Sequence, residues 1–353
     1  MRQILPNPVV QVRGVDRANS ASYKFDAPGL IRLWHLISLD APTVAVVWTL
    51  AFAWASKVRL PVWTPVLLAL AAWVVYIVDR VLDARAAIRT NDLASLRERH
   101  RFHQRHMGLL IPVALVAAGA AGWIVFTLMP SVARERNSVL ALAGLAYFAR
   151  VHSPGKVAFG LTSFSRFLKK EMLVGILFAA ACALPAISRA STHANQSLWP
   201  LYAAAVVFAL LAWLNCHAID RWESDEEECE KEWKATLDGT KDRVESRGFP
   251  PLRQKKGART GHGWVSSIED SESRWTADKS DVLLPAFLLA GGGLLLGAVL
   301  SFHQPRPAAL IVAGAVSALL LALIDCLRSR LTPIAVRAAA DLVLLVPLAL
   351  LLK

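Results

Sequence analysis

Charged residues are scarce in this sequence of 353 residues, at 19% of the total, whereas hydrophobic residues make up 55%. A soluble globular domain contains about 25% charged residues and about 45–50% apolar ones. The scarcity is concentrated, because the stretches 282–301 and 307–324 contain no charged residue at all. Each is long enough to cross the hydrocarbon core of a bilayer as a helix. The composition therefore excludes an ordinary soluble enzyme and predicts a membrane protein.

Cysteines are also few, and the four present (Cys182, Cys216, Cys229 and Cys326) form no Cys-x-x-Cys pair. This spacing supports neither a structural zinc site nor a disulfide framework. The net charge of +12 is accompanied by no RNA-recognition, helix-turn-helix or zinc-finger pattern, so we expect no nucleic-acid partner. We attribute the charge mainly to membrane orientation and expect membrane lipids, including anionic head groups, as partners.

Nine stretches are apolar enough to predict membrane-spanning helices. They are 36–56, 61–79, 108–129, 137–149, 171–189, 198–219, 282–301, 307–327 and 333–352. With these spans, 32 of the 39 Lys and Arg residues fall on one side of the membrane. Positively charged loops stay in the cytoplasm, so the N-terminus is predicted to be cytoplasmic and the C-terminus external. The Ala- and Arg-rich composition favours a bacterial plasma (inner) membrane.

The predicted fold class is therefore all-α, a polytopic membrane protein. We expect a polar cytoplasmic tail at 1–33 and a nine-helix membrane domain at 34–352. A long charged cytoplasmic loop, 221–280, is inserted between the sixth and seventh spans. It has few aliphatic residues and cannot bury a core, so it is expected to be disordered or only partly helical. The main interpretation is a solvated linker, and a gating or partner-binding role is the alternative.

The acidic residues within the spans all lie towards predicted cytoplasmic ends, and none interrupts the outer half of a span. Ionisable groups in a bilayer are costly unless they are paired, hydrated or bound to an ion, and they are usually functional. Their one-sided convergence predicts a polar cavity that opens to the cytoplasm. Asp40 is one of them, and it either lines this cavity or caps a helix. Arg337 and Asp341 are four residues apart and are expected to form an ion pair within one helix.

Two pairs of acids have similar surroundings. Asp79 and Asp83 are four residues apart at the end of the second span, and Asp220 and Glu223 are three apart at the end of the sixth. Each pair shares one helix face. Two carboxylate pairs facing each other across a bundle would suit Mg²⁺ and a diphosphate, because Mg²⁺ takes one or two carboxylates plus substrate phosphates. The alternative is that these acids face water or pair with neighbouring arginines.

These segments resemble those of the UbiA-type intramembrane prenyltransferase superfamily. Asp79 and Asp83 match the last two acids of its first Asp-rich motif, and the stretch 219–223 (Ile-Asp-Arg-Trp-Glu) resembles the second. The stretch 167–170 (Phe-Leu-Lys-Lys) resembles the basic segment that enters the fifth helix. The sequence departs from the family where Val75-Tyr76 replaces Asn-Asp, and where Ser224 stands four residues after Asp220.

The resemblance implies a UbiA-like bundle of nine helices around a central cavity open to the cytoplasmic side. It also implies a Mg²⁺-dependent prenyltransferase that moves an isoprenyl group from an isoprenyl diphosphate to an aromatic or other lipophilic acceptor. The residues implied as catalytic and as Mg²⁺ ligands are Asp79, Asp83, Asp220 and Glu223. Those implied to bind diphosphate are Lys169, Lys170, Arg89 and Asn215. Two alternatives stay open: a non-catalytic UbiA-fold protein that binds an isoprenoid or quinone-like lipid, and a transporter.

Three histidines repeat every third residue between the second and third spans, at His100, His103 and His106. Interleaved arginines favour an interfacial amphipathic helix on anionic lipid. A cap over the cavity and a metal site are the alternatives, because neutral imidazole is a common metal ligand.

Overall fold

The computed structural model describes residue 26 and residues 28–89, 98–152, 170–192, 197–245 and 281–352, and these contain helices and no β-sheet. The first helices are α1 (Gly29–Leu36), α2 (Asp40–Ala55), α3 (Trp63–Arg89), α4 (Glu98–Arg105), α5 (Met107–Thr127) and α6 (Ser131–His152). The others are α7 (Lys170–Ala190), α8 (Trp199–Glu245), α10 (Leu283–Ser301), α11 (Pro305–Leu327), the 3₁₀ helix η3 (Arg328–Arg330), α12 (Pro333–Val343) and α13 (Leu348–Leu351). The all-α prediction is confirmed for this part of the chain.

Six helices in the described ranges are long and apolar enough to cross a membrane: α3, α5, α7, α8, α10 and α11. The count is seven if the bent pair α1–α2 forms one span. Large apolar side chains face outward on these helices, for example Trp123 (68% exposed) and Phe126 (76%) on α5 and Leu295 (70%) on α10. Such surfaces indicate a membrane-embedded protein with lipid against them. The count of nine spans and the sidedness remain predictions.

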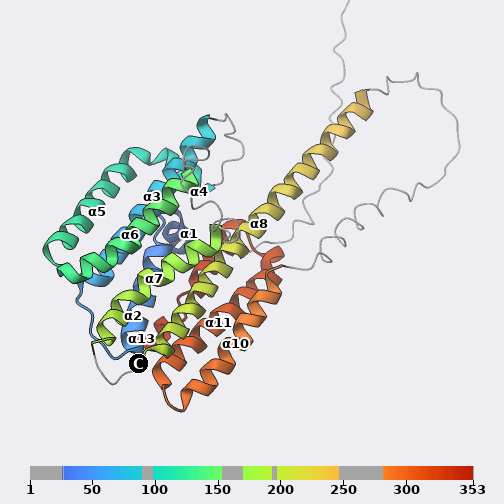
Figure 1. Ribbon diagram of the computed structural model, residues 1–353. Coiled ribbons are helices and arrows are strands. Elements are labelled where there is room, and N and C mark those ends of the chain that lie inside the picture. Colours follow the sequence, from blue (N-terminus) through green and yellow to red (C-terminus); the bar gives the residue numbers. More distant parts are fainter. Residues whose placement is uncertain are drawn as a thin grey trace, which may run out of the picture.

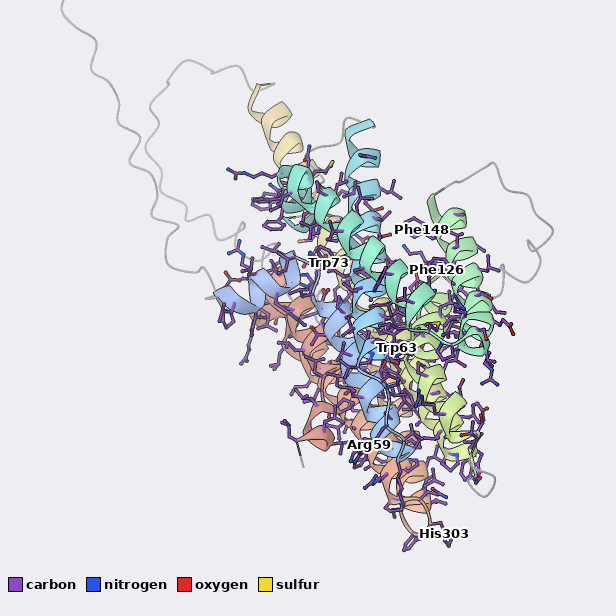
Figure 2. All side chains as sticks on the ribbon, turned by 90° about the vertical axis from the view of Figure 1, so that its left-hand side faces the viewer. Arg59, Trp63, Trp73, Phe126, Phe148 and His303 are labelled. Carbon is purple, nitrogen blue, oxygen red and sulfur yellow. The ribbon has the colours of Figure 1, made fainter. Side chains whose placement is uncertain are left out.

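The long helices run alternately up and down the bundle (Figure 1). The C-terminus lies at the opposite end from the part of α8 that projects beyond the other helices. Figure 2 shows Arg59 and His303 towards one end and Trp73 and Phe148 towards the other. The turns after α2 and α10 therefore share an end.

The predicted first span, 36–56, corresponds to α2, and α1, which precedes it, meets α2 at an angle of 90°. α1 ends in a Schellman motif, in which the N–H of Ser38 donates to His35 O (3.1 Å) and that of Leu39 to Trp34 O (3.0 Å). The motif needs a left-handed residue, and Ser38 supplies it with φ 56°. α2 then begins at Asp40. Pro42 fits its first turn, where a backbone N–H has no partner within the helix.

The predicted fourth and ninth spans also differ from the expectation. α6 covers 131–152, longer than the predicted 137–149, and it contains Arg134, Glu135 and Arg136. The ninth, 333–352, breaks into α12 and α13, with turns at 344–347 ahead of a helix that starts after Pro347. Proline lacks the N–H that a continuous helix would use. Neither α6 nor α12 with α13 is apolar and long enough to count as a span.

The break after α12 leaves the carbonyls of Val343 and Leu344 without the N–H of the residue four positions later, and side chains from other helices donate to them instead. Ser317 Oγ of α11 donates to Val343 O at 2.7 Å, and Trp48 Nε1 of α2 donates to Leu344 O at 2.9 Å. Unpaired carbonyls are costly in a bilayer. Trp48 is fully buried and stacks on Phe208 of α8 with ring centroids 3.8 Å apart. These contacts join α2, α8, α11 and α12 into one core.

α8 is much longer than the predicted sixth span, 198–219. Its 47 residues would extend about 70 Å, more than twice the roughly 30 Å of a hydrocarbon core. The helix continues through the acidic start of the predicted loop 221–280 and ends at Glu245. The first part of that loop is therefore helical, as one of the two expectations allowed. Residues 246–280 and 1–25, which include most of the predicted tail, lie outside the described residues.

Candidate functional site

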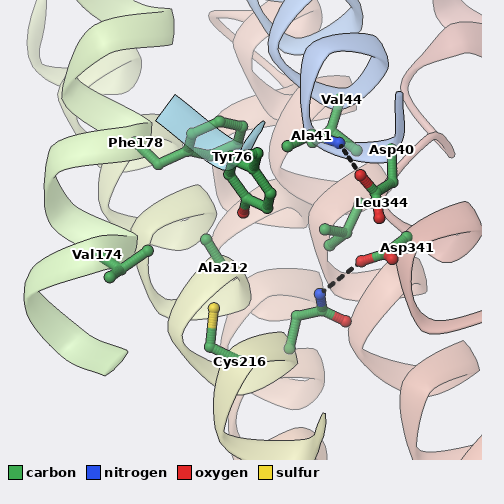
Figure 3. A pocket seen from close by; sticks show the side chains of 11 residues that line it. Asp40, Ala41, Val44, Tyr76, Val174, Phe178, Ala212, Cys216, Asp341 and Leu344 are labelled. Atoms are coloured by element: carbon green, nitrogen blue, oxygen red, sulfur yellow. Dashed lines mark hydrogen bonds between the residues drawn. The ribbon is translucent and has the colours of Figure 1, made fainter. Parts of the chain in front are cut away.

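A pocket of about 40 Å³ lies inside the bundle, where α2, α3, α7, α8 and α12 approach one another. Its lining comprises Asp40, Ala41, Val44, Tyr76, Val174, Phe178, Ala212, Asn215, Cys216, Asp341 and Leu344. Figure 3 shows the two carboxylates together on one side, with Phe178 and Val174 of α7 across from them. The pocket therefore has one polar side and one apolar side, which suits the head of an amphiphilic ligand.

The polar side is formed by helix ends and by one buried amide. Asp40 is the first residue of α2, and its Oδ1 accepts a hydrogen bond from the N–H of Ala41 at 2.9 Å (Figure 3). Asn215 of α8 donates from Nδ2 to Asp341 Oδ1 at 3.3 Å. Asp40 thus lines this pocket, whereas Leu39 stands at the N-cap of α2 and no side chain caps that helix end.

The apolar side depends on the close approach of α7 and α8. Gly175 makes this approach possible, because a Cβ at this position would lie 2.7 Å from Ala209 O and 2.8 Å from the backbone N of Trp213. Small residues allow helices in a membrane to pack at such short distances. Val174 and Phe178, on either side of Gly175 in sequence, then reach the pocket.

His35 completes the polar side from outside the pocket lining. Its Nδ1 lies 3.0 Å from Asp40 Oδ2 and 3.3 Å from Asp341 Oδ2. All three residues have little exposure: His35 is 5% exposed, Asp40 is 7% exposed, and the side chain of Asp341 is 15% exposed. The 90° bend between α1 and α2 brings His35 back to Asp40, and α12 supplies Asp341.

The predicted acids of α3 continue from the pocket towards the end of the bundle. Tyr76 lines the pocket, and Asp79 and Asp83 follow three and seven residues later on the same helix face. Asp79 Oδ2 lies 3.6 Å from Arg80 Nη1, and its side chain is 34% exposed. Asp79 is also within electrostatic range of Tyr147 on α6. Asp79 and Asp83 are therefore placed beside the pocket, not in its lining.

The predicted acids of α8 separate from each other. Asp220 is exposed, and it lies four residues after Cys216, on the face of α8 that lines the pocket. Glu223 is only 8% exposed, and its Oε1 lies 3.0 Å from Arg337 Nε of α12. Arg337 Nη2 also lies 3.5 Å from Glu226 Oε2. Glu223 is thus neutralised by an arginine.

The expectation of an Arg337–Asp341 pair within α12 is corrected by these contacts. Arg337 pairs with the acids of α8, whereas Asp341 contacts His35 and Asn215. Groups on neighbouring helices supply both partners. The i,i+4 spacing alone does not reveal such groups.

Among the predicted diphosphate ligands, Asn215 lines the pocket and Lys170 is exposed at the first turn of α7. Lys170 and Arg80 are within electrostatic range of the Cys216 thiol. Basic groups from α3 and α7 therefore stand near the pocket. Lys169 and the side chain of Arg89 lie outside the described residues.

The positions of these residues fit the implied Mg²⁺ site only in part. In the described part of the chain, the one group of three or more His, Cys, Asp or Glu residues close enough to share an ion is His35, Asp40 and Asp341. Asp79, Asp83, Asp220 and Glu223 do not form such a group. Asp79 and Asp83 still fit a Mg²⁺ ion that arrives with a diphosphate, because one or two carboxylates then suffice. Glu223 does not fit, since its carboxylate pairs with Arg337.

The histidine segment forms α4, which packs beside the α1–α2 bend. His103 is fully buried, and its Nε2 lies 3.4 Å from Ser38 Oγ in the bend. The exposed His106 contacts Phe102 O through Nδ1 at 2.9 Å. The side chain of His100 is not among those described. α4 therefore packs against the bend, no α4 residue lines the pocket, and the interfacial helix, the cap and the metal site all stay predictions.

Sequence reasoning did not single out His35. It identified Asp40, Asp341 and Asn215 separately and did not connect them. A histidine five residues before an aspartate at the start of an apolar run was an available pattern. The two side chains meet only because the chain bends at Ser38. The sequence gives no sign of this bend, because the left-handed position holds serine and not the usual glycine.

The polar groups of α1, α2, α3, α8 and α12 thus meet around one small pocket, which is the candidate functional site. No protein-family model matches this chain, and comparisons with curated proteins and with solved structures found no match.

Proposed function

We propose that this chain is an integral-membrane prenyltransferase, which moves an isoprenyl group from an isoprenyl diphosphate to a lipophilic acceptor. The observation that supports it is the amphiphilic pocket bordered by both acid-bearing helices. Tyr76 of α3 and Cys216 of α8 line it, and acids follow each of them on the same helix face. The plasma membrane of a bacterium, with a cytoplasmic pocket opening, is part of this proposal.

The acids that follow the pocket-lining residues on α3 and α8 would hold the diphosphate head of the donor outside the pocket. On α3 these acids are Asp79 and Asp83, and on α8 the acid is Asp220. Lys170 at the start of α7 would contact phosphate oxygens directly, since charge-assisted hydrogen bonds to phosphate are strong. A bound Mg²⁺ ion would supply neutralisation of the charge that develops on the departing diphosphate.

The pocket would receive the reacting part of the acceptor. At about 40 Å³ it has room for a small polar group but not for a whole isoprenyl chain. The donor chain would therefore lie among the apolar helices, with its first carbon facing the pocket. The bond between that carbon and the diphosphate oxygen would break, and the carbon would form a new bond to the acceptor. The acceptor would then release a proton, and diphosphate would leave.

A non-catalytic lipid-binding protein is the second candidate, and one contact favours it. Arg337 forms an ion pair with the carboxylate of Glu223. Of the two acids predicted on α8, only Asp220 is then available to bind Mg²⁺. A protein of this kind would hold an isoprenoid or quinone-like lipid without cleaving a diphosphate.

The test uses the purified chain in detergent with Mg²⁺ and radiolabelled geranyl or longer diphosphates. We expect donor turnover with release of diphosphate, and its loss in the double variant Asp79→Asn/Asp220→Asn. Glu135→Gln changes an exposed acid of α6 outside the pocket lining and is the matched control. Turnover at the wild-type rate in the double variant would refute the assignment. Donor or lipid binding without diphosphate release in the wild type would also refute it, in favour of the second candidate.

A further inference from the structure

Three potential metal ligands converge at the polar side of the pocket, apart from the acids assigned to the donor. His35, Asp40 and Asp341 each offer one ligand atom, and these atoms all lie within 4.8 Å of one another. They come from three helices, so their convergence is a property of the tertiary fold. No neighbouring pair within a single helix produces it.

The spacing matches neighbouring ligands on one ion. A metal held about 2.1 Å from each ligand places adjacent ligand atoms about 3.0 Å apart in octahedral geometry and about 3.4 Å apart in tetrahedral geometry. The two distances from His35 Nδ1, to Asp40 Oδ2 and to Asp341 Oδ2, are 3.0 and 3.3 Å. Neither contact has the alignment of a hydrogen bond. A ring nitrogen that binds a metal through its lone pair does not need that alignment.

A second group points independently to a ligand. Asn215 is 95% buried, since 5% of it is exposed, and it lines the pocket with Asp40 and Asp341. Its Oδ1 is buried and has no hydrogen-bond partner in the described part of the chain. Buried polar atoms are almost always satisfied, so this oxygen indicates that the pocket holds a polar ligand or water. A pocket of about 40 Å³ also leaves room for one or more water ligands.

The charges favour a cation at this position. Asp40 and Asp341 are two carboxylates with one imidazole between them, and neither forms an ion pair with a Lys or Arg side chain in the described ranges. Arg337, one turn before Asp341, is paired with Glu223 instead. Buried carboxylates are costly unless a partner compensates them. A divalent ion would provide that compensation.

We propose that His35, Asp40 and Asp341 bind a divalent transition-metal ion, with water completing the coordination. One imidazole with oxygen ligands suits Zn²⁺ or Mn²⁺ better than Mg²⁺, which prefers oxygen ligands alone. The site does not use Asp79, Asp83 or Asp220, so it does not rest on the proposed prenyl transfer. Its position against the pocket would place the ion next to a bound ligand.

The experiment uses the full chain, purified in detergent without a polyhistidine tag and stripped of metal with a chelator. Zn²⁺ and Mn²⁺ are titrated against a chromophoric competitor, and bound metal is counted by elemental analysis. We expect one ion per chain. His35→Ala and Asp341→Asn should each weaken its affinity by at least 100-fold. His106→Ala and Glu135→Gln, which alter an exposed histidine and an exposed acid of α6, should leave affinity unchanged.

A spectroscopic measurement on the wild-type protein does not depend on whether the variants fold. X-ray absorption of the metal-loaded wild-type protein should show one imidazole nitrogen among oxygen ligands. Absence of stoichiometric metal from the wild type would overturn the proposal. So would unchanged affinity in His35→Ala and Asp341→Asn variants that elute as the wild type does on size exclusion. Failure of the donor assay with an intact metal site would refute only the proposed function.

Discussion

Replacing Arg337 by methionine should destabilise the protein strongly, because it would remove the arginine that pairs with the buried carboxylate of Glu223. The Arg337 Nε–Glu223 Oε1 distance is 3.0 Å, and both side chains are 10% exposed. At an effective dielectric constant of about 20, that separation corresponds to a Coulomb attraction of about 5.5 kcal/mol. Removing one member of a buried pair typically costs about 3–5 kcal/mol. We expect the free energy of unfolding to fall by about this amount in Arg337→Met.

Two further variants separate the buried pair from general effects of lost charge. Glu226→Gln removes the second acid beside Arg337, at 3.5 Å, but its side chain is 46% exposed, so the cost should stay below about 1 kcal/mol. The double variant Glu223→Leu/Arg337→Met removes both buried charges and should recover most of the loss, because buried pairs are often replaceable by apolar residues. The assay is chemical unfolding in mixed micelles, followed by fluorescence of the 12 tryptophans. The reasoning is refuted if Arg337→Met is as stable as Glu226→Gln.

Three other predictions concern helix packing and helix ends, each measured by thermal unfolding in detergent. Gly175→Ala should lower the free energy of unfolding by about 1–3 kcal/mol, because the new Cβ would lie 2.7 Å from a backbone oxygen. Gly291→Ala is the control and should not lower it, because nothing lies within 4 Å of the new Cβ. Trp48→Phe should cost about 1–3 kcal/mol, because it leaves a buried carbonyl at the end of α12 without its donor. Lys57→Gly should stabilise by about 1 kcal/mol, because this exposed residue has φ 57°; an unchanged melting temperature would contradict the strain argument.

The apolar runs of the sequence predicted the long helices well. Six predicted spans correspond to α3, α5, α7, α8, α10 and α11, because uninterrupted apolar stretches of about 20 residues have few other solutions in a bilayer. The remaining three spans were predicted on weaker patterns. α6 has charges in its first turns, and the end of the chain includes Pro347. Composition over a window does not show where a helix breaks.

The site was less predictable, because its contacts join segments far apart in the sequence. Asp341 and His35 are 306 positions apart, and no spacing rule connects them. Spacing did suggest a local partner for Asp341, namely Arg337. That residue instead meets Glu223, because α8 lies beside α12 and presents a buried carboxylate. Local spacing predicts which groups share a helix face, whereas the fold decides which face meets which.

One backbone feature connects the unpredicted helix break with the unpredicted cluster. In a continuous helix, residues 35 and 40 would point about 140° apart, at about 100° per residue, and their side chains could not meet. The left-handed Ser38 reverses this, because the Schellman motif it forms turns the chain by 90° and brings His35 Nδ1 to 3.0 Å from Asp40 Oδ2. A non-glycine residue in this conformation costs about 1–2 kcal/mol. Such strain persists where surrounding contacts fix it, often at functional sites. Here His103 from α4 lies against Ser38 Oγ at 3.4 Å, so the bend and the ligand cluster are supported by one set of contacts.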